Sequence, residues 1–170
     1  DSDQLGQTQF TQPALYLVSY LEAKSKIEDG QHPALAAGHS VGEFAALATA
    51  GAFSFMEGLR MVSKRGEIMS KVSGGGMAAV IGLDVENIRL TLEKAGADQV
   101  DLANFNSPGQ IVLSGPAKQI ETILSPLKDA GARMVVPLKV SGAFHSRMME
   151  EPAREFGNFL NEFTFSNPSF

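Results

Sequence analysis

Ser40 is the residue whose type and surroundings most directly indicate chemistry. It lies in the sequence Gly38-His-Ser-Val-Gly, with small residues before it and the helix-forming run 43–50 after it. A G-x-S-x-G pattern in this context is typical of a strand, a sharp turn and a helix, with the serine hydroxyl exposed as a nucleophile. The amides at the start of that helix would face a developing oxyanion. The same residues also fit an ordinary strand-to-helix turn, and the pattern alone leaves that alternative open.

His145 is the candidate base for this serine. It follows residues 140–142, where the chain is expected to return from an inserted lobe to the lobe that carries Ser40. That position suits a general base that later acts as a general acid, although a loop histidine alone is more often a surface or packing residue. The aspartates between the two residues fall in the inserted lobe, where they are poorly placed to orient the imidazole, so a Ser-His dyad is predicted. These aspartates are Asp84, Asp98, Asp101 and Asp129.

Arg65 lies on the apolar face of a predicted helix over residues 56–72. At about 100° per residue, polar side chains share one face of this helix, and Arg65 falls in the middle of the other. The apolar face is formed by Met61, Val62, Ile68, Met69 and Val72. A charge at that position is costly unless it is paired. Two interpretations stay equally open: an arginine that pairs with a structural carboxylate or reaches the surface, and a guanidinium held for a substrate anion.

The elements around these residues predict an α/β protein. A helix is expected to start near Thr11 as its cap, with Pro13 in its first turn. A short, central strand over 33–38 would carry Ser40 just past its C-terminal end, where ligands gather in an open α/β sheet. A last helix is predicted over 151–163.

Residues 74–139 predict a second, smaller lobe. The glycines at 74–76 could suggest a phosphate loop, but they precede a predicted strand and lack its Gly-Lys-Ser/Thr. They are therefore interpreted as a flexible crossing into this lobe. The elements expected there are strand 78–83, helix 84–95, strand 100–104, strand 110–114, helix 117–130 and strand 133–138. This βαββαβ order is the ferredoxin-like arrangement. The domain prediction is a core lobe over 1–73 and 140–170, interrupted by the small lobe.

Composition excludes several classes of function. The net charge is −5 without a block of basic residues, so nucleic acid is not an expected partner. No apolar run is long enough for a membrane span, and no signal peptide opens the chain. The absence of Cys excludes disulfides and zinc–thiolate sites, and His32, His39 and His145 lack metal-ligand spacing. A cytoplasmic protein without a metal is expected, and the start at Asp1 without Met predicts a piece of something longer.

With these residues assembled, the chain resembles the malonyl-CoA:acyl-carrier-protein transacylases and the acyltransferase domains of polyketide synthases. The matching motifs are Thr11-Gln-Pro-Ala, Gly38-His-Ser-Val-Gly-Glu, Lys64-Arg-Gly, Gly76-Met-Ala-Ala-Val, Asn104-Phe-Asn-Ser-Pro-Gly-Gln and Gly142-Ala-Phe-His. They run through nearly the whole chain, and their joint spacing is highly specific. The run 140–148, Val-Ser-Gly-Ala-Phe-His-Ser-Arg-Met, is most similar to the discrete, trans-acting acyltransferases that serve polyketide assembly lines.

The resemblance implies catalytic roles. Ser40 would be the nucleophile that carries the acyl group, and His145 would be its acid/base partner. The backbone amide of Val41 would be one donor of the oxyanion hole. Arg65 would bind the free carboxylate of malonyl, which explains an arginine on an apolar face.

Further positions are implied to contact or surround the substrate. Phe144 matches the position where malonyl-selective members carry Phe and members that use branched extenders usually carry Ser. Gln12 and Asn104 would lie near the site, whereas His39 is expected to be structural.

The implied reaction is transfer of malonyl from malonyl-CoA through a Ser40 ester to the phosphopantetheine thiol of an acyl carrier protein. It is a ping-pong reaction without a cofactor or metal, in polyketide or fatty acid biosynthesis. One alternative is a hydrolase that clears acyl carrier proteins with the same Ser-His dyad, which has no need for Arg65. Another is an inactive fragment or docking module that only binds carrier proteins.

The implied fold is an α/β-hydrolase-like core lobe, a parallel sheet with flanking helices, into which the ferredoxin-like lobe is inserted. The family begins with a first strand and a Gly-Gln-Gly-Ser-Gln loop, whose last Gln lines the oxyanion hole. It ends with further strands and a Gln that helps to hold the active-site His. Neither region is present in the 170 residues, so a domain truncated at both ends is expected, with an unpaired sheet edge and an incomplete oxyanion hole.

Overall fold

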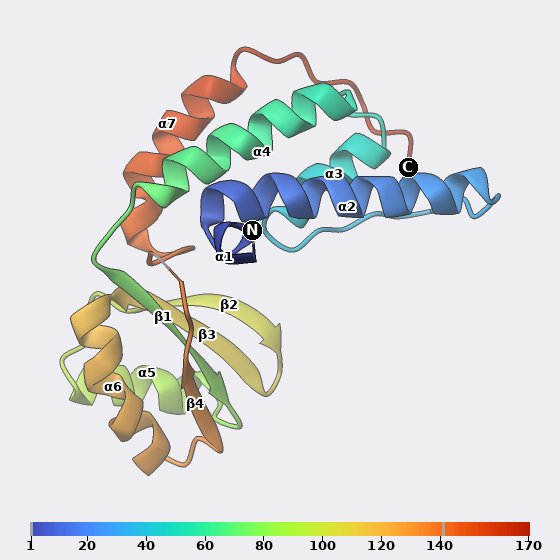
Figure 1. Cartoon of the computed structure of the whole chain (residues 1–170). Helices are drawn as coiled ribbons and strands as arrows, with labels where there is room; N and C mark the ends of the chain where they lie inside the picture. Colours follow the sequence, from blue (N-terminus) through green and yellow to red (C-terminus); the bar gives the residue numbers. More distant parts are fainter. Residues whose placement is uncertain (1, 141) are drawn as a thin grey trace. The chain divides into compact units, whose positions relative to one another are not determined.

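The chain has a mixed α/β fold, in which the strands of the described residues all lie between residues 75 and 137 and helices occur before, within and after that stretch (Figure 1). The computed structural model describes residues 2–140 and 142–170; Asp1, and Ser141 of the 140–148 motif, lie outside the described residues. The chain divides into a helical unit, Asp1–Ser70 with Arg154–Phe170, and a sheet unit, Lys71–Ala153. Residues 140–153 therefore group with the sheet unit. No helix among the described residues is long and apolar enough to cross a membrane.

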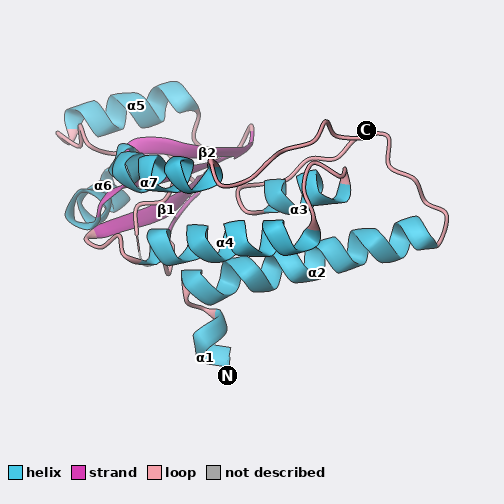
Figure 2. Cartoon of the chain, turned by 90° about the horizontal axis from the view of Figure 1, so that it is seen from above, coloured by secondary structure: helices cyan, strands magenta, loops and turns pink. Residues whose placement is uncertain are grey.

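The helical unit is built around two long helices that lie side by side (Figure 2). Its elements are α1 (Ser2–Leu5), α2 (Thr8–Glu28), α3 (Gly42–Thr49), α4 (Phe55–Ser70) and the C-terminal part of α7 (Glu150–Leu160). Tyr16 of α2 is 1% exposed and packs in one core with Met61 and Val62 of α4. Its hydroxyl donates to the Phe55 carbonyl at 3.0 Å, and burial raises the pKa of Tyr16 to about 12.

Helix α2 starts earlier than the sequence predicts. Thr11 is not its cap: Gln7 holds the N-cap position, and the N–H groups of Phe10 and Thr11 already donate to the Gln7 carbonyl. The Thr11 hydroxyl instead donates back to the carbonyls of Leu5 and Gln7. Pro13 consequently lies inside the helix rather than in its first turn. The short helix α1 and its turn supply the acceptors that a helix start at Thr11 would have lacked.

The strand predicted over residues 33–38 is not formed. A strand is defined by hydrogen bonds to a partner strand. Among the described residues of the helical unit no strand is present, so segment 33–38 has no partner strand in that unit. Leu35 is 87% exposed, and a cavity of about 670 Å³ runs along the segment between α2 and α3. The segment still leads directly to Ser40, as the sequence predicts.

The sheet unit has the order of elements that the sequence predicts for residues 74–139. They are β1 (Gly75–Ile81), α5 (Val85–Lys94), β2 (Asp101–Ser107), β3 (Gln110–Pro116), α6 (Ala117–Asp129) and β4 (Met134–Pro137). The sheet order is β2-β3-β1-β4, with every neighbouring pair antiparallel. The largest shifts are of three residues: β1 starts at Gly75 rather than at Ala78, and β2 ends at Ser107 rather than at Asn104. Gly75 and Gly76, predicted as part of a flexible crossing, therefore belong to a strand.

The two faces of this sheet are covered differently. Helices α5 and α6 cover one face (Figure 1), where Ala78 and Val80 of β1 are fully buried. The alternate residues Met77 and Ala79 point to the opposite face, as expected for a pleated strand. There they pack with Val112 of β3 and with Phe144. The segment that follows β4 therefore crosses this second face before the 3-10 helix η1 (Arg147–Met149) and α7 begin.

Candidate active site

Ser40 occupies a sharp turn immediately before α3. Its φ is +54°, a left-handed conformation that non-glycine residues adopt rarely and at a cost of about 1–2 kcal/mol. The turn is closed by hydrogen bonds from the Gly42 amide to the His39 carbonyl at 3.0 Å and from the Glu43 amide to the Ser40 carbonyl at 3.2 Å. Val41 is the N-cap residue of α3, so the helix begins at Gly42, two residues after the serine. Strained backbone of this kind is concentrated at functional sites.

Gly38 makes the turn sterically possible. A Cβ added there would overlap the backbone of Gly42 and Glu43, whereas a Cβ added at Gly42 meets nothing within 4 Å. The chain before Ser40 therefore lies directly against the start of α3.

These two glycines should respond oppositely to alanine. We expect Gly38→Ala to destabilise the protein by about 3 kcal/mol, because neither backbone segment can move without moving Ser40. For a domain of this size that lowers Tm by about 6–12 °C. Gly42→Ala should be neutral or stabilising by up to about 1 kcal/mol, since alanine favours the helix. Thermal unfolding of both variants measures this, and equal Tm values would contradict the close approach at Gly38.

Arg65 of α4 reaches this serine. Its Nη2 donates to Ser40 Oγ at 3.1 Å, and its Nη1 donates to Gln12 Oε1 at 2.6 Å. The guanidinium also lies 6.0 Å from the ring centroid of Phe44. Burial lowers the pKa of Arg65, and the nearby charge of Glu43 opposes that shift. Both side-chain bonds go to neutral groups, and among the described residues no carboxylate forms an ion pair with Arg65.

This geometry bears on the two interpretations of Arg65 left open by the sequence. A structural carboxylate would have been found in contact with the guanidinium, and a snorkelling side chain would lie at the surface. Arg65 is instead half-buried, and its charge is desolvated without a contacting counterion among the described residues. That arrangement suits an anionic ligand beside Ser40, because an anion would supply the missing charge.

Gln12 holds Arg65 from the side of α2. It is 5% exposed, and its Nε2 donates to the sulfur of Met69 at 3.1 Å while its oxygen accepts from Arg65. The amide is thus orientated at both ends. Met69 is a residue of this site that the sequence does not reveal, because it reads there only as one more member of an apolar helix face.

The other predicted site residues belong to the sheet unit. His145 has φ +60° and is exposed, and the half-buried Phe144 packs on the second face of the sheet. Asn104 lies half-buried on β2, opposite Val112. The structure thus brings Ser40, Arg65 and Gln12 together in one unit and carries Phe144, His145 and Asn104 in the other. Proximity of Ser40 and His145 stays a prediction.

No group of three or more His, Asp or Glu side chains that could hold a metal ion occurs among the residues that the structure describes.

The chain is similar to known acyltransferases over nearly its whole length. Residues 1–169 match the family model described as acyl transferase domain. The polyketide biosynthesis malonyl CoA-acyl carrier protein transacylase PksC of Bacillus subtilis is 50% identical over 167 residues, which is 97% of this chain and 58% of PksC. The chain therefore spans little more than half the length of this relative.

Solved structures show the same relationship. Malonyl CoA-acyl carrier protein transacylase from Burkholderia pseudomallei superimposes with a TM-score of 0.95 at 42% identity, covering 99% of this chain and 58% of that one. A malonyl-transacylase solved in complex with its type II polyketide synthase acyl-carrier protein superimposes with a TM-score of 0.94 at 36% identity, covering 100% and 57%.

Proposed function

Because the chain belongs to the acyl transferase domain family, we propose that it provides the nucleophile and the substrate-binding arginine of a malonyl-CoA:acyl-carrier-protein transacylase. The donor would be malonyl-CoA, and the acceptor the phosphopantetheine thiol of an acyl carrier protein in polyketide or fatty acid biosynthesis. The relatives that carry this activity in their names extend well beyond the part that this chain covers. The proposal therefore concerns the whole domain to which these residues contribute.

One observation carries this proposal: the half-buried guanidinium of Arg65 lies 3.1 Å from the hydroxyl oxygen of Ser40. A malonyl group has an ester-forming carbonyl at one end and a carboxylate at the other. A cation next to the nucleophile can bind the carboxylate through two hydrogen bonds and orient the thioester for attack. The hydrogen bond to Gln12 holds the guanidinium in place before the substrate binds. Less side-chain entropy is therefore lost when the carboxylate is bound.

In the first half-reaction, Ser40 Oγ attacks the thioester carbonyl of malonyl-CoA while His145 removes the hydroxyl proton. The tetrahedral oxyanion would be stabilised by the Val41 amide, at the start of α3. Collapse of the intermediate breaks the C–S bond, and His145 returns the proton to the coenzyme A thiolate. Malonyl remains on Ser40 as an ester.

In the second half-reaction, the phosphopantetheine thiol of the carrier protein takes the place of coenzyme A. His145 removes the thiol proton, the sulfur attacks the malonyl ester, and the same histidine returns the proton to Ser40 Oγ. The products are malonyl-carrier protein and the free serine. Atoms and charges balance without a cofactor, and Arg65 retains the malonyl carboxylate through both steps.

Intact mass spectrometry of the protein after incubation with malonyl-CoA tests this function. A stable malonyl adduct on Ser40 that disappears on addition of a phosphopantetheinylated carrier protein is the expected result. Release of free malonate without transfer would identify a hydrolase. Absence of an adduct in the intact protein would leave only carrier-protein binding, and the proposed function would be wrong.

We also propose a fold for the two lobes of the whole domain. In a whole domain, segment 33–38 would form one strand of the parallel sheet of an α/β-hydrolase-like core lobe. The exposed Leu35 and the cavity along the segment are consistent with a sheet that these residues do not complete by themselves. The β-α-β-β-α-β order and the strand order β2-β3-β1-β4 support a ferredoxin-like small lobe.

Phe144 should select malonyl over methylmalonyl. Its ring, anchored on Met77 and Ala79, would crowd the carbon that bears the extra methyl. Replacing Phe144 with Ser should therefore raise the specificity constant for methylmalonyl-CoA relative to that for malonyl-CoA. The change in the ratio should correspond to about 1–3 kcal/mol of transition-state free energy at most, the value for one methyl group. The measurement is kcat/KM for both thioesters in wild type and Phe144→Ser. An unchanged ratio would place the selectivity elsewhere in the pocket.

A further inference from the structure

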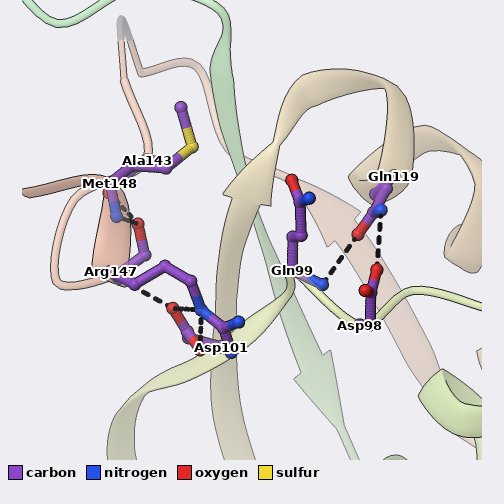
Figure 3. Close-up of polar contacts among 8 residues, drawn as sticks. Asp98, Gln99, Asp101, Gln119, Ala143, Arg147 and Met148 are labelled. Atoms are coloured by element: carbon purple, nitrogen blue, oxygen red, sulfur yellow. Dashed lines mark hydrogen bonds and ion pairs between the residues drawn. The ribbon is translucent and has the colours of Figure 1, made fainter.

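Asp101 and Arg147 form an ion pair directly beside the segment that carries His145 (Figure 3). The Asp101 carboxylate accepts a hydrogen bond from Nη2 of Arg147 at 2.7 Å and from its Nε at 3.1 Å. It also accepts the backbone N–H of Arg147 at 2.7 Å. One carboxylate thus holds both the side chain and the main chain of a residue two positions after the histidine.

The sheet positions Asp101 for this contact. Asp101 begins β2 and lies opposite Ser114 of β3, whereas Leu102 lies opposite Leu113. Leu113 is fully buried against the helices, so side chains alternate and Asp101 points to the other face. Phe144 packs on that same face. The register of β2 and β3 therefore places the carboxylate where the chain passes after β4.

His145 lies between two anchors of this segment. Before it, Phe144 packs on the sheet, and Ala143 lies so close to Gly75 that a Cβ on the glycine would overlap it. After it, Arg147 is held by Asp101. Between them the Ser146 hydroxyl donates to the Ala143 carbonyl at 2.7 Å and accepts the Met148 amide at 3.2 Å.

The backbone of His145 needs such anchors. Its φ of +60° is unfavourable for a side chain with a Cβ, and a residue keeps this conformation only where its surroundings impose it. We propose that Asp101, through Arg147, is a positioning residue that holds the His145 turn in its reactive conformation. This inference rests on the proposed function of His145 as the acid and base for Ser40.

An exposed ion pair alone would be a weak basis for this role, because such pairs contribute little to global stability. The side chain of Asp101 is, however, only 25% exposed, against 57% for Arg147, and the contact is bidentate with an added main-chain bond. The neighbouring guanidinium holds the pKa of Asp101 below its usual range. The consequence should therefore be local order at residues 142–149 rather than a large change in the stability of the sheet.

Asp101→Ala removes the anchor, and Asp101→Asn is the graded variant, since its amide oxygen can still accept the Arg147 backbone N–H. Arg147→Ala breaks the same pair from the other side. Asp98→Asn is the matched control: Asp98 accepts Nε2 of Gln119 at 3.3 Å and acts on Arg147 only through its charge (Figure 3). It removes one negative charge near Arg147 without removing a contact.

The readouts are amide hydrogen exchange in peptides spanning 142–149 and steady-state malonyl transfer by the intact protein. For Asp101→Ala and Arg147→Ala we expect exchange in these peptides to rise about tenfold, with other sheet peptides unchanged. We expect kcat to fall about 10- to 100-fold, because displacements near 1 Å cost that much, while KM for malonyl-CoA changes less than about threefold. Asp101→Asn should fall between these variants and wild type, and Asp98→Asn should match wild type.

The two readouts separate failure of this inference from failure of the proposed function. Unchanged exchange in Asp101→Ala would overturn the anchoring, whatever the activity. Faster exchange with unchanged kcat in an active enzyme would make the pair structural only and overturn the positioning role. A wild-type protein that never accepts malonyl would refute the proposed function, and the exchange data would still decide whether Asp101 holds the turn. A loss in Asp98→Asn equal to that in Asp101→Ala would show a general charge effect and overturn the specific one.

Discussion

Ser40→Ala should abolish covalent malonylation while leaving the fold intact. The hydroxyl is the only group of Ser40 that the proposed reaction uses, and the alanine Cβ occupies the same place in the turn as the serine Cβ. Loss of the nucleophile in serine enzymes lowers kcat on the order of 10⁴- to 10⁶-fold, so no adduct should form during an incubation that loads wild type completely. The measurement is intact mass after exposure to malonyl-CoA.

A matched control is Ser63→Ala, which removes an exposed serine of α4. It should be malonylated like wild type. The free energy of unfolding of both variants should lie within about 1 kcal/mol of the wild-type value, as expected for changes that create no cavity. Persistent malonylation of Ser40→Ala, mapped to another residue, would remove Ser40 from its assigned role. The hydrogen bond that Arg65 donates to Ser40 Oγ would then be a packing contact only.

The sheet unit could be predicted from sequence because its elements are regular and local. The continuous apolar run of β1 and turn residues such as Pro108 and Gly109 mark its strands, and Asp84 caps α5 by accepting the Asn87 amide. In the helical unit the start of α2 and the strand over 33–38 could not be predicted correctly from the sequence. The start of α2 depends on carbonyls supplied by α1, and the strand over 33–38 depends on partners that the described residues do not supply.

The candidate site was predictable as a set of residues but not as a geometry. Periodicity placed Arg65 on an apolar face, yet it could not distinguish a structural carboxylate from a ligand. In the structure Arg65 contacts Ser40, 25 residues away in the sequence, and Gln12, 53 residues away. The Asp101–Arg147 pair is unpredictable for the same reason, since 46 residues separate its members. The sequence suggests Asp101 only as a direct partner of the imidazole, a role that its place in the inserted lobe does not favour. Long-range side-chain pairs depend on packing rather than on local pattern.

Arg65→Ala should separate malonyl-CoA from acetyl-CoA as substrates. The guanidinium is partly desolvated and lacks a contacting carboxylate among the described residues, and in the proposed function the malonyl carboxylate serves as its counterion. Removing a charge-assisted pair of this kind costs about 3 kcal/mol, or about a hundredfold in the rate of malonyl loading. Acetyl-CoA has no carboxylate, so its slow loading should fall little or even improve. The measurement is the rate of Ser40 acylation by each thioester, followed by intact mass.

Two further variants make this comparison specific. Lys64→Ala removes the adjacent cation, whose ion pairs go to Glu67 and Glu155 at the surface, and it should change neither rate. Arg65→Lys keeps the charge but loses the planar fork, so it should recover only part of the malonyl rate. Equal losses with both thioesters in Arg65→Ala would mean that the arginine only supports the Ser40 turn and Gln12. The assignment of malonyl would then lose its main support, whereas the assignment of Ser40 as nucleophile would stand.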